Sequence, residues 1–240
     1  MTSLFTKMLT SRCSGISRNF RRAIRVVRQT NESLTNSATA AFIILGSSLA
    51  IAQEAPTEAD YYPITTIETP GDTLFELGGI EILPENKVAV STRRGEIWIA
   101  DGAFESEQPK WTMHAQYLHE PLGLSWKDGW LYCTQRPEIT RMKDEDGDGR
   151  ADIFETVADG WGINGNYHEY AFGTKHDSKG NIYTVLCLTG SFTAHSLFRG
   201  WSMKLGSDGE LVPWASGIRS PGGIGFNAEE DVFYTDNQGA

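Results

Sequence analysis

The phrase that decides the fold is a glycine followed by a short apolar strand, and it occurs at Gly79-Ile80-Glu81-Ile82, Gly123-Leu124-Ser125-Trp126, Gly173-Thr174-Lys175 and Gly223-Ile224-Gly225-Phe226. The intervals between the four glycines are 123 − 79 = 44, 173 − 123 = 50 and 223 − 173 = 50 residues. A repeat of about 40 to 50 residues that opens with a strand is typical of β-propeller blades. We therefore expect each copy to begin one blade.

After each phrase the sequence returns to short alternating segments that are separated by polar turns. The expected second strands are 88–91, 131–134, 182–185 and 232–235, the third strands are 96–99, 139–142 and 201–205, and the fourth strands are 111–113, 154–157 and 211–214. The sequence thus predicts an all-β chain, an incomplete β-propeller of about three and a half four-stranded antiparallel blades over residues 62–240. A β-sandwich is the alternative, because it also has evenly spaced strands.

The repeat stops in the middle of a unit, since the last expected strand is followed only by residues 236–240. A closed propeller has typically four to eight blades, and an open ring leaves strand edges unpaired. We therefore expect this chain to be the N-terminal part of a larger protein, with a truncated, inactive gene product as the alternative. The alternating segment 62–68 is expected to form one further strand.

The first 52 residues differ in composition from the rest and predict a signal peptide. Seven Lys and Arg residues precede residue 30, an apolar stretch covers 38–52, and Ala50-Ile51-Ala52 has small residues at both ends. A basic region, an apolar core and a small-x-small site describe a secretory signal. We expect cleavage before Gln53, a flexible mature N-terminus over 53–61, and a periplasmic or extracellular protein without membrane insertion. An uncleaved membrane anchor is the alternative.

Removal of this segment makes the chain strongly acidic. It carries seven of the 21 Lys and Arg residues and one of the 31 Asp and Glu residues, so 14 basic and 30 acidic residues remain, a balance of −16. Such a charge disfavours nucleic acid and anionic membranes as partners and favours multivalent cations.

The sharpest local motif is the acidic segment 144–155, which follows the spacing of a twelve-residue calcium loop. Carboxylates or a carbonyl fill the ligand positions one, three, five, seven, nine and twelve, which are Asp144, Asp146, Asp148, Arg150, Asp152 and Glu155. Strands rather than helices flank the loop, so we expect a structural Ca²⁺ site rather than a calcium sensor. A solvated acidic turn is the alternative.

Two further segments, 161–173 and 216–223, carry a family resemblance. The first has His168 shortly before Phe172-Gly173, and the second reads Gly217-Ile218-Arg219-Ser220-Pro221-Gly222. Here the chain resembles the soluble quinoprotein glucose/sorbosone dehydrogenase family, in the form found in large exported planctomycete proteins described as membrane-bound dehydrogenases.

The resemblance implies pyrroloquinoline quinone (PQQ) as cofactor and oxidation of a carbohydrate or an alcohol by the intact protein. It implies that His168 acts as general base on the substrate hydroxyl and that Arg219 contacts the quinone and stabilises charge on its oxygen. An electron-accepting protein is then a further expected partner. The alternative function is a non-catalytic propeller that binds glycans or proteins.

The remaining cysteines and histidines give only weak indications of function. Cys133 and Cys187 lie in expected second strands of neighbouring blades, where a buried thiol is ordinary, and a disulfide is the alternative. His114 and His119 flank an expected outer strand without metal-ligand spacing, which indicates surface or hydrogen-bonded histidines.

Overall fold

The structure is a computed structural model that describes residues 55–71, 73–188 and 196–237. The chain divides into two units, Met1–Pro56 and Thr57–Ala240, of which only the second is largely described. The predicted signal segment, 1–52, lies outside the described residues. No helix in the described part of the chain is long and apolar enough to cross a membrane.

The second unit consists of three four-stranded antiparallel sheets and one two-stranded sheet, each with its strands in chain order. The first sheet contains β1 (Leu77–Ile82), β2 (Val88–Thr92), β3 (Glu96–Asp101) and β4 (Lys110–Ala115). The second contains β5 (Leu124–Lys127), β6 (Trp130–Thr134), β7 (Ile139–Lys143) and β8 (Ile153–Ala158). The third contains β9 (Ala171–His176), β10 (Ile182–Leu186), β11 (Trp201–Leu205) and β12 (Leu211–Ser216), and the fourth contains β13 (Pro221–Phe226) and β14 (Val232–Asp236). The predicted fold class is confirmed.

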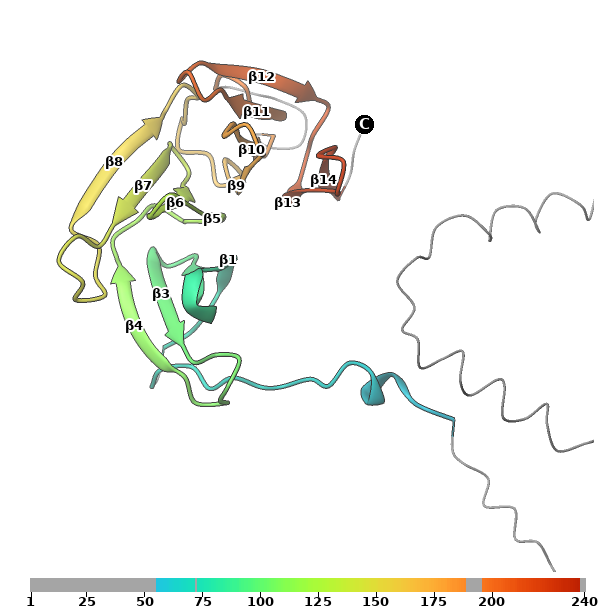
Figure 1. Cartoon of the computed structure of the whole chain (residues 1–240). Helices are drawn as coiled ribbons and strands as arrows, with labels where there is room; N and C mark the ends of the chain where they lie inside the picture. Colours follow the sequence, from blue (N-terminus) through green and yellow to red (C-terminus); the bar gives the residue numbers. More distant parts are fainter. Residues whose placement is uncertain (1–54, 72, 189–195, 238–240) are drawn as a thin grey trace, which may run out of the picture. The chain divides into compact units, whose positions relative to one another are not determined.

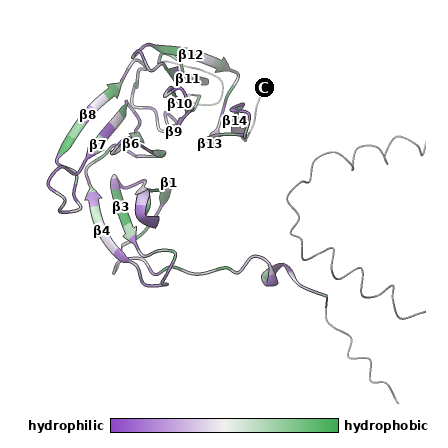
Figure 2. Ribbon diagram, viewed as in Figure 1, coloured by the Kyte–Doolittle hydropathy of each residue, from purple (hydrophilic) through white to green (hydrophobic). Residues whose placement is uncertain are grey.

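The sheets follow one another in an arc, with the first strand of each on the inner side and β4, β8 and β12 on the outer side (Figure 1). The inner strands contact one another in sequence, β1 with β5, β5 with β9 and β9 with β13. Figure 2 shows that both hydrophobic and hydrophilic residues occur along the strands. This is the arrangement expected of propeller blades.

The repeated glycines explain why the inner strands approach so closely. A Cβ atom built on Gly79 would lie 3.0 Å from the Cα of Gly123, and one on Gly123 would lie 2.4 Å from the carbonyl carbon of Gly173. A Cβ on Gly173, whose φ is +73°, would lie 2.3 Å from Cγ2 of Ile224. Glycine is therefore required by the distance between backbones, and at Gly173 also by the left-handed conformation.

Two apolar cores lie between consecutive sheets. One joins the first and second sheets through buried residues that include Ile97, Leu131 and Met142. The other joins the second and third sheets, with Ile139 and Met203 among its fully buried members. Because alternate residues of a strand point to opposite faces, each sheet can contribute side chains to the cores on both of its sides. Cys133 and Cys187 are buried free thiols; Cys133 lies on β6 as expected, whereas Cys187 lies directly after the end of β10.

Polar contacts also join the inner strands. Lys175 on β9 forms an ion pair of 2.6 Å with Glu81 on β1, although 94 residues separate them. Between the second and third sheets, the His176 imidazole accepts or donates a 3.0 Å hydrogen bond with the Ser125 hydroxyl and packs edge-on against the Tyr132 ring. Burial lowers the pKa of His176 to about 4, with the nearby Lys127 charge acting in the same direction.

Antiparallel strands in chain order place alternate connections at opposite edges of a sheet. The connections between sheets (116–123, 159–170 and 217–220) therefore share one face with the links between second and third strands, and we call this the connection face. The other links, including the acidic segment between β7 and β8, lie on the opposite face. The predicted calcium loop and the predicted His168 and Arg219 are thus on different faces.

The prediction of a strand over 62–68 is wrong. These residues are exposed and extended but belong to no sheet. Two hydrogen bonds hold their end, from the Glu68 amide to the Glu107 carbonyl (2.8 Å) and from the Trp111 indole to the Glu68 carbonyl (2.7 Å). Alternation alone suggested a strand, but no neighbouring strand supplies the ladder of hydrogen bonds that a strand needs.

The glycine contacts predict that Gly123→Ala destabilises the protein. Its Cβ would collide with backbone atoms of Gly173, which can move only with the whole of β9. We expect a loss of about 1–3 kcal/mol in the free energy of unfolding, and a fall of about 2–4 °C in Tm for each kcal/mol. Gly223→Ala is the matched control at the fourth repeat, because a Cβ there meets nothing within 4 Å. Equal stabilities of the two variants in urea unfolding would contradict this account.

His176 predicts a loss of stability in mild acid. Its folded pKa of about 4 lies below the ordinary value of 6.5, so the unfolded chain binds a proton first as the pH falls. Stability should be fully present above about pH 6.5 and should decline down to about pH 4. Urea unfolding of wild type and His176→Gln at pH 7 and pH 4.5 should show a smaller pH effect in the variant. The same pH dependence in both proteins would contradict the prediction.

Candidate functional site

His168 lies in the connection 159–170, which leads into the inner strand β9. Its side chain is exposed, its ring packs edge-on at 5.0 Å from the ring of Tyr167, and its amide donates a 3.0 Å hydrogen bond to Oδ1 of Asn166. The imidazole is therefore open to a ligand while its backbone is held in place.

A buried carboxylate fixes this connection. Glu169 is only 1% exposed, and its Oε2 accepts backbone hydrogen bonds from Asn164 (2.8 Å), Gly165 (3.1 Å) and Asn166 (3.2 Å). Its Oε1 accepts a 2.9 Å bond from the Ser196 hydroxyl. Burial raises the pKa of Glu169, but the hydrogen bonds and the Arg199 charge outweigh it, so the pKa lies below its usual value. The charged carboxylate thus organises the loop that carries His168.

Arg199, which lies just before β11 of the third sheet, holds the same connection. Its guanidinium donates to the Gly162 carbonyl (2.9 and 3.3 Å) and to the Tyr170 carbonyl (3.1 Å), and the residue is 3% exposed. The side chain is therefore a buried structural clamp. No pattern in the sequence indicates this role.

A cluster of charged and aromatic side chains adjoins His168 on the connection face, and the sequence did not reveal it. Oε1 of Glu120 lies 3.3 Å from Nε of Arg93, and Oε2 lies 3.0 Å from Nε of Arg136, the latter pair at an angle that makes an ion pair rather than a hydrogen bond. Both guanidinium groups lie over the Tyr170 ring, at 5.6 and 5.0 Å from its centroid. Arg136 also donates to the Tyr167 carbonyl at 2.5 Å.

The two tyrosines of this cluster differ in acidity. Burial and the neighbouring Tyr167 raise the pKa of Tyr170 to about 12. The hydroxyl of Tyr170 and the charge of Arg93 lower the pKa of the exposed Tyr167. The more acidic phenol is therefore the one beside His168, where it can give or accept a proton.

Arg219 lies in the connection that leads into β13. Its amide and that of Ser220 donate to the Asp236 carboxylate at 3.1 and 2.7 Å, and its carbonyl accepts hydrogen bonds from Leu188 and Cys187. Its backbone is thus fixed against the ends of β10 and β14. His168 and Arg219 lie in connections on the same face, and the contacts of each involve different neighbours.

The acidic loop brings together three of its predicted ligands. Carboxylate oxygens of Asp144, Asp146 and Asp152 all lie within 4.8 Å of one another. Asp144 also accepts hydrogen bonds from the amides of Gly147 (2.7 Å) and Gly149 (2.8 Å), both of which have positive φ. The loop is therefore wound so that alternate carboxylates converge, which is the arrangement that a hard cation requires.

The other predicted ligands have different surroundings. Glu155 lies on β8, where its carboxylate pairs with Arg141 at 2.5 and 2.7 Å directly across the β7–β8 ladder. Asp148 accepts a 2.7 Å hydrogen bond from the amide of Arg150, inside the loop. The group of converging carboxylates thus does not contain position five or position twelve of the motif.

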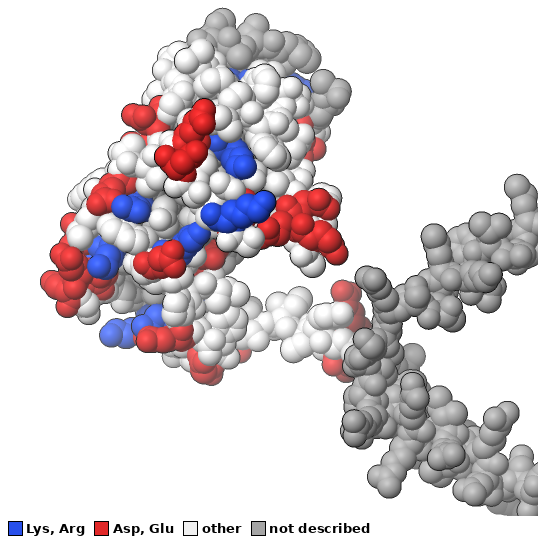
Figure 3. Space-filling view, turned by 45° about the horizontal axis from the view of Figure 1, so that its top comes forward, with Lys and Arg blue, Asp and Glu red and all other residues white. Residues whose placement is uncertain are grey.

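Acidic and basic side chains are mixed on the face drawn in Figure 3. Lys and Arg side chains lie among Asp and Glu side chains there, without one continuous basic patch. The field of this face therefore lacks the single sign that nucleic-acid binding requires.

Residues 98–240 match the model of a family described as a domain of unknown function (DUF7133). No curated protein matches the chain. Among solved structures, the chain is similar to the PQQ-bound form of aldose sugar dehydrogenase from Streptomyces coelicolor, with 16% identity and a TM-score of 0.56 over 71% of this chain and 59% of that one.

Two other similar structures come from Thermus thermophilus and Xanthomonas campestris. The first is an oxidoreductase described as a glucose dehydrogenase, with 14% identity, a TM-score of 0.53 and coverage of 67% of this chain and 57% of that one. The second is a gluconolactonase, with 13% identity, a TM-score of 0.52 and coverage of 75% and 61%. At these identities the likeness shows the β-propeller fold. The chain spans less than two thirds of each of these structures.

Proposed function

Because this chain belongs to the family described as a domain of unknown function (DUF7133), whose description assigns no activity, we propose a function from the connection face. In the intact protein this face oxidises a hydroxyl group of a carbohydrate or an alcohol with PQQ, and calcium stabilises the propeller. The observation that carries the proposal is an exposed histidine on a loop that two buried charged residues, Glu169 and Arg199, hold in place.

His168 is the general base of the proposed reaction. An imidazole suits this role because its ordinary pKa lies near physiological pH. The exposed ring can accept the proton of a substrate hydroxyl, and the hydrogen bonds of Glu169 keep the loop from rearranging when the substrate arrives. Tyr167, whose pKa is lowered, lies beside it and can relay that proton to solvent.

The connection face also fits a planar quinone that carries carboxylates. The guanidinium group of an arginine binds a carboxylate through two hydrogen bonds and stacks on flat rings. Arg93 offers such a group over the ring of Tyr170, and Arg219 lies in the next connection, before β13. When bound, PQQ supplies the acceptor for the hydride of the substrate carbon. Arg219 stabilises the negative charge that develops on oxygen.

Calcium is the second part of the proposal. The converging oxygens of Asp144, Asp146 and Asp152 are hard ligands that fit Ca²⁺, and the carbonyl of Arg150 and oxygens of Asp148 lie in the same loop. The ion would connect β7 to β8 and offset the repulsion among the carboxylates.

The place of action follows from the N-terminal sequence. Cleavage before Gln53 would release the protein to the periplasm or the extracellular space, where soluble sugars, alcohols and an electron-accepting protein are its proposed partners. A propeller that binds glycans or proteins without catalysis is the second candidate, and the experiments below separate the two.

Calcium should raise the thermal midpoint of the wild-type chain. A ligand at a hundredfold excess over its Kd stabilises by about 2.7 kcal/mol, which corresponds to several degrees in Tm. Asp146→Asn should abolish the response while keeping a similar volume and the loop hydrogen bond. Asp208→Asn is the matched control, because Asp208 also caps a turn, between β11 and β12, outside the acidic cluster. If the wild-type Tm does not respond to calcium, the segment 144–155 is a solvated acidic turn and not a calcium site.

His168→Ala should reduce quinone-dependent dye reduction by the intact protein by about 10²–10⁴-fold, the contribution of a positioned base. The side chain is exposed, so Tm and the calcium response should not change. Arg219→Gln should weaken both quinone binding and turnover, because its charge acts on cofactor and transition state. His119→Ala, at an exposed histidine on the same face, is the matched control. An intact protein that binds no quinone, or His168→Ala with wild-type turnover, would favour the binding scaffold.

A further inference from the structure

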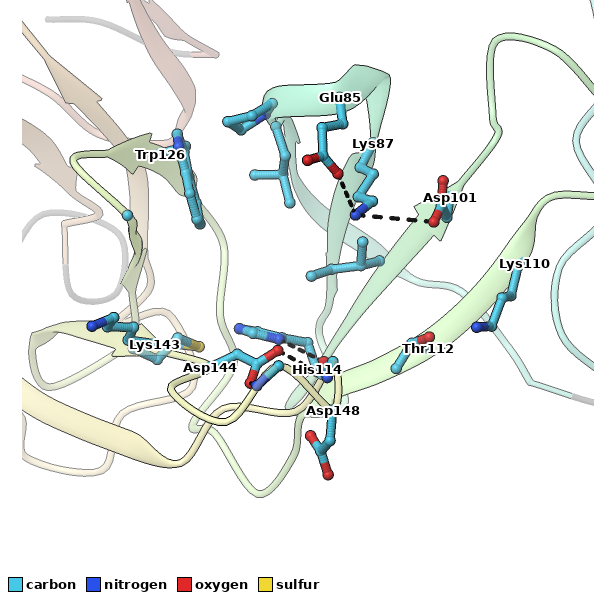
Figure 4. A pocket seen from close by; sticks show the side chains of 17 residues that line it. Glu85, Lys87, Asp101, Lys110, Thr112, His114, Trp126, Lys143, Asp144 and Asp148 are labelled. Carbon is cyan, nitrogen blue, oxygen red and sulfur yellow. Dashed lines mark hydrogen bonds and ion pairs between the residues drawn. The ribbon is translucent and has the colours of Figure 1, made fainter.

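A groove of about 430 Å³ lies on the opposite face, between the first and second sheets (Figure 4). Its size is typical of small-molecule sites, which span about 300–1,000 Å³. Leu83, Ile99, Trp126 and Met142 supply apolar lining, and the indole of Trp126 forms one side. Trp126 is half-buried, so part of its ring serves the core and part faces the groove.

His114 lies at the base of this groove, beside Asp144 (Figure 4). The residue is 6% exposed, and its Nδ1 lies 2.9 Å from the Gly149 carbonyl oxygen. A carbonyl can only accept a hydrogen bond, so Nδ1 carries the proton. In the neutral imidazole the other ring nitrogen, Nε2, is then an acceptor. Nε2 is buried and has no hydrogen-bond partner among the described residues.

A buried acceptor without a partner is costly, so the groove is suited to a ligand that donates a hydrogen bond from a hydroxyl or an amine. The charges of the lining argue for a neutral ligand. Three lysines (Lys87, Lys110, Lys143) face four carboxylates (Glu85, Asp101, Asp144, Asp148), a balance of −1, which a Ca²⁺ ion on Asp144 and Asp148 would change to +1. Lys87 is already paired with Glu85 at 2.8 Å. Neither an anion nor a strong cation would find a field of one sign.

We propose that this groove binds a neutral saccharide, a monosaccharide or disaccharide, at a site separate from the connection face. The flat face of Trp126 receives the C–H groups of a sugar ring, because aromatic rings offer an apolar surface with a polar edge. A sugar hydroxyl donates to Nε2 of His114, and the surrounding carboxylates and lysines exchange hydrogen bonds with the other hydroxyls. Alternate donors and acceptors around one apolar wall match a polyol better than an aromatic or lipid ligand.

The proposal is tested by saturation-transfer NMR and calorimetry on the full chain with glucose, galactose, xylose and cellobiose as probes. At least one of them should bind, and its ring C–H protons should receive saturation from the protein. Absence of binding for all four sugars overturns the proposal.

His114→Asn is the decisive variant, because its side-chain amide can still donate toward the Gly149 carbonyl but offers no acceptor at the position of Nε2. Affinity for the sugar should fall by about tenfold, the effect of losing one hydrogen bond to a buried group. His119→Asn makes the same substitution on the other face and should bind as wild type does. Unchanged affinity in a folded His114→Asn protein would contradict the proposed contact.

Trp126→Leu provides a second variant if His114→Asn does not fold. It keeps an apolar side chain against the core and removes the flat surface, so the saturation of ring C–H protons should be lost. His119→Asn, on the connection face, should keep both the saturation of the ring C–H protons and the wild-type affinity. Wild-type affinity and saturation in a folded Trp126→Leu protein would place the sugar outside the groove and overturn the groove site.

Discussion

The architecture depends on the distance between the inner strands at the repeated glycines. The backbones of β1, β5 and β9 come so close at Gly79, Gly123 and Gly173 that no side chain fits between them. Further out along each sheet, side chains separate neighbouring sheets and form the two cores. Contact at the inner end and separation at the outer end make each sheet a wedge. The arc of Figure 1 follows from that taper.

The wedge shape also explains why the connection face and the groove both lie at the ends of the strands. Backbone atoms fill the space between the inner strands, so hollows and exposed polar groups occur at the links on the two faces. On the connection face, Glu169 and Arg199 satisfy the backbone groups of a long link from the inside, and the link can then present His168 and Tyr167 outward. A buried charge is retained here because its oxygens or nitrogens have hydrogen-bond partners, which are backbone groups and, for Oε1 of Glu169, the Ser196 hydroxyl.

The strands could be predicted from the sequence because their signals are local. Alternation, turn residues and the glycine period located every strand of the four sheets. The carboxylates of Asp144, Asp146 and Asp152 could also be placed together, since glycines at 147 and 149 wind the loop. Glu155 could not be placed, because β8 begins at Ile153 and turns the twelfth position across the sheet toward Arg141.

The long-range contacts could not be predicted, because the signals in the sequence are local. The partners of His114, Glu120 and Glu169 come from other sheets or from segments up to 35 residues away, and no spacing in the sequence encodes them. The sequence indicates an ordinary outer-strand histidine at His114, whereas in the structure its Nδ1 lies 2.9 Å from the Gly149 carbonyl oxygen. The segment 62–68 shows the converse error, in which a correct local pattern had no neighbour to pair with.

The ion pair between Lys175 and Glu81 has a consequence for cooperativity. The glycine contacts and the two cores couple each sheet only to the next one, as in a nearest-neighbour chain of repeats, which can lose terminal units one at a time. Lys175 reaches from the third sheet to Glu81 on the first, and the same ammonium group also donates a 3.4 Å hydrogen bond to the Leu124 carbonyl on β5 of the second. Fraying of the first sheet therefore also removes a contact of the third, so the three sheets are coupled beyond their immediate neighbours.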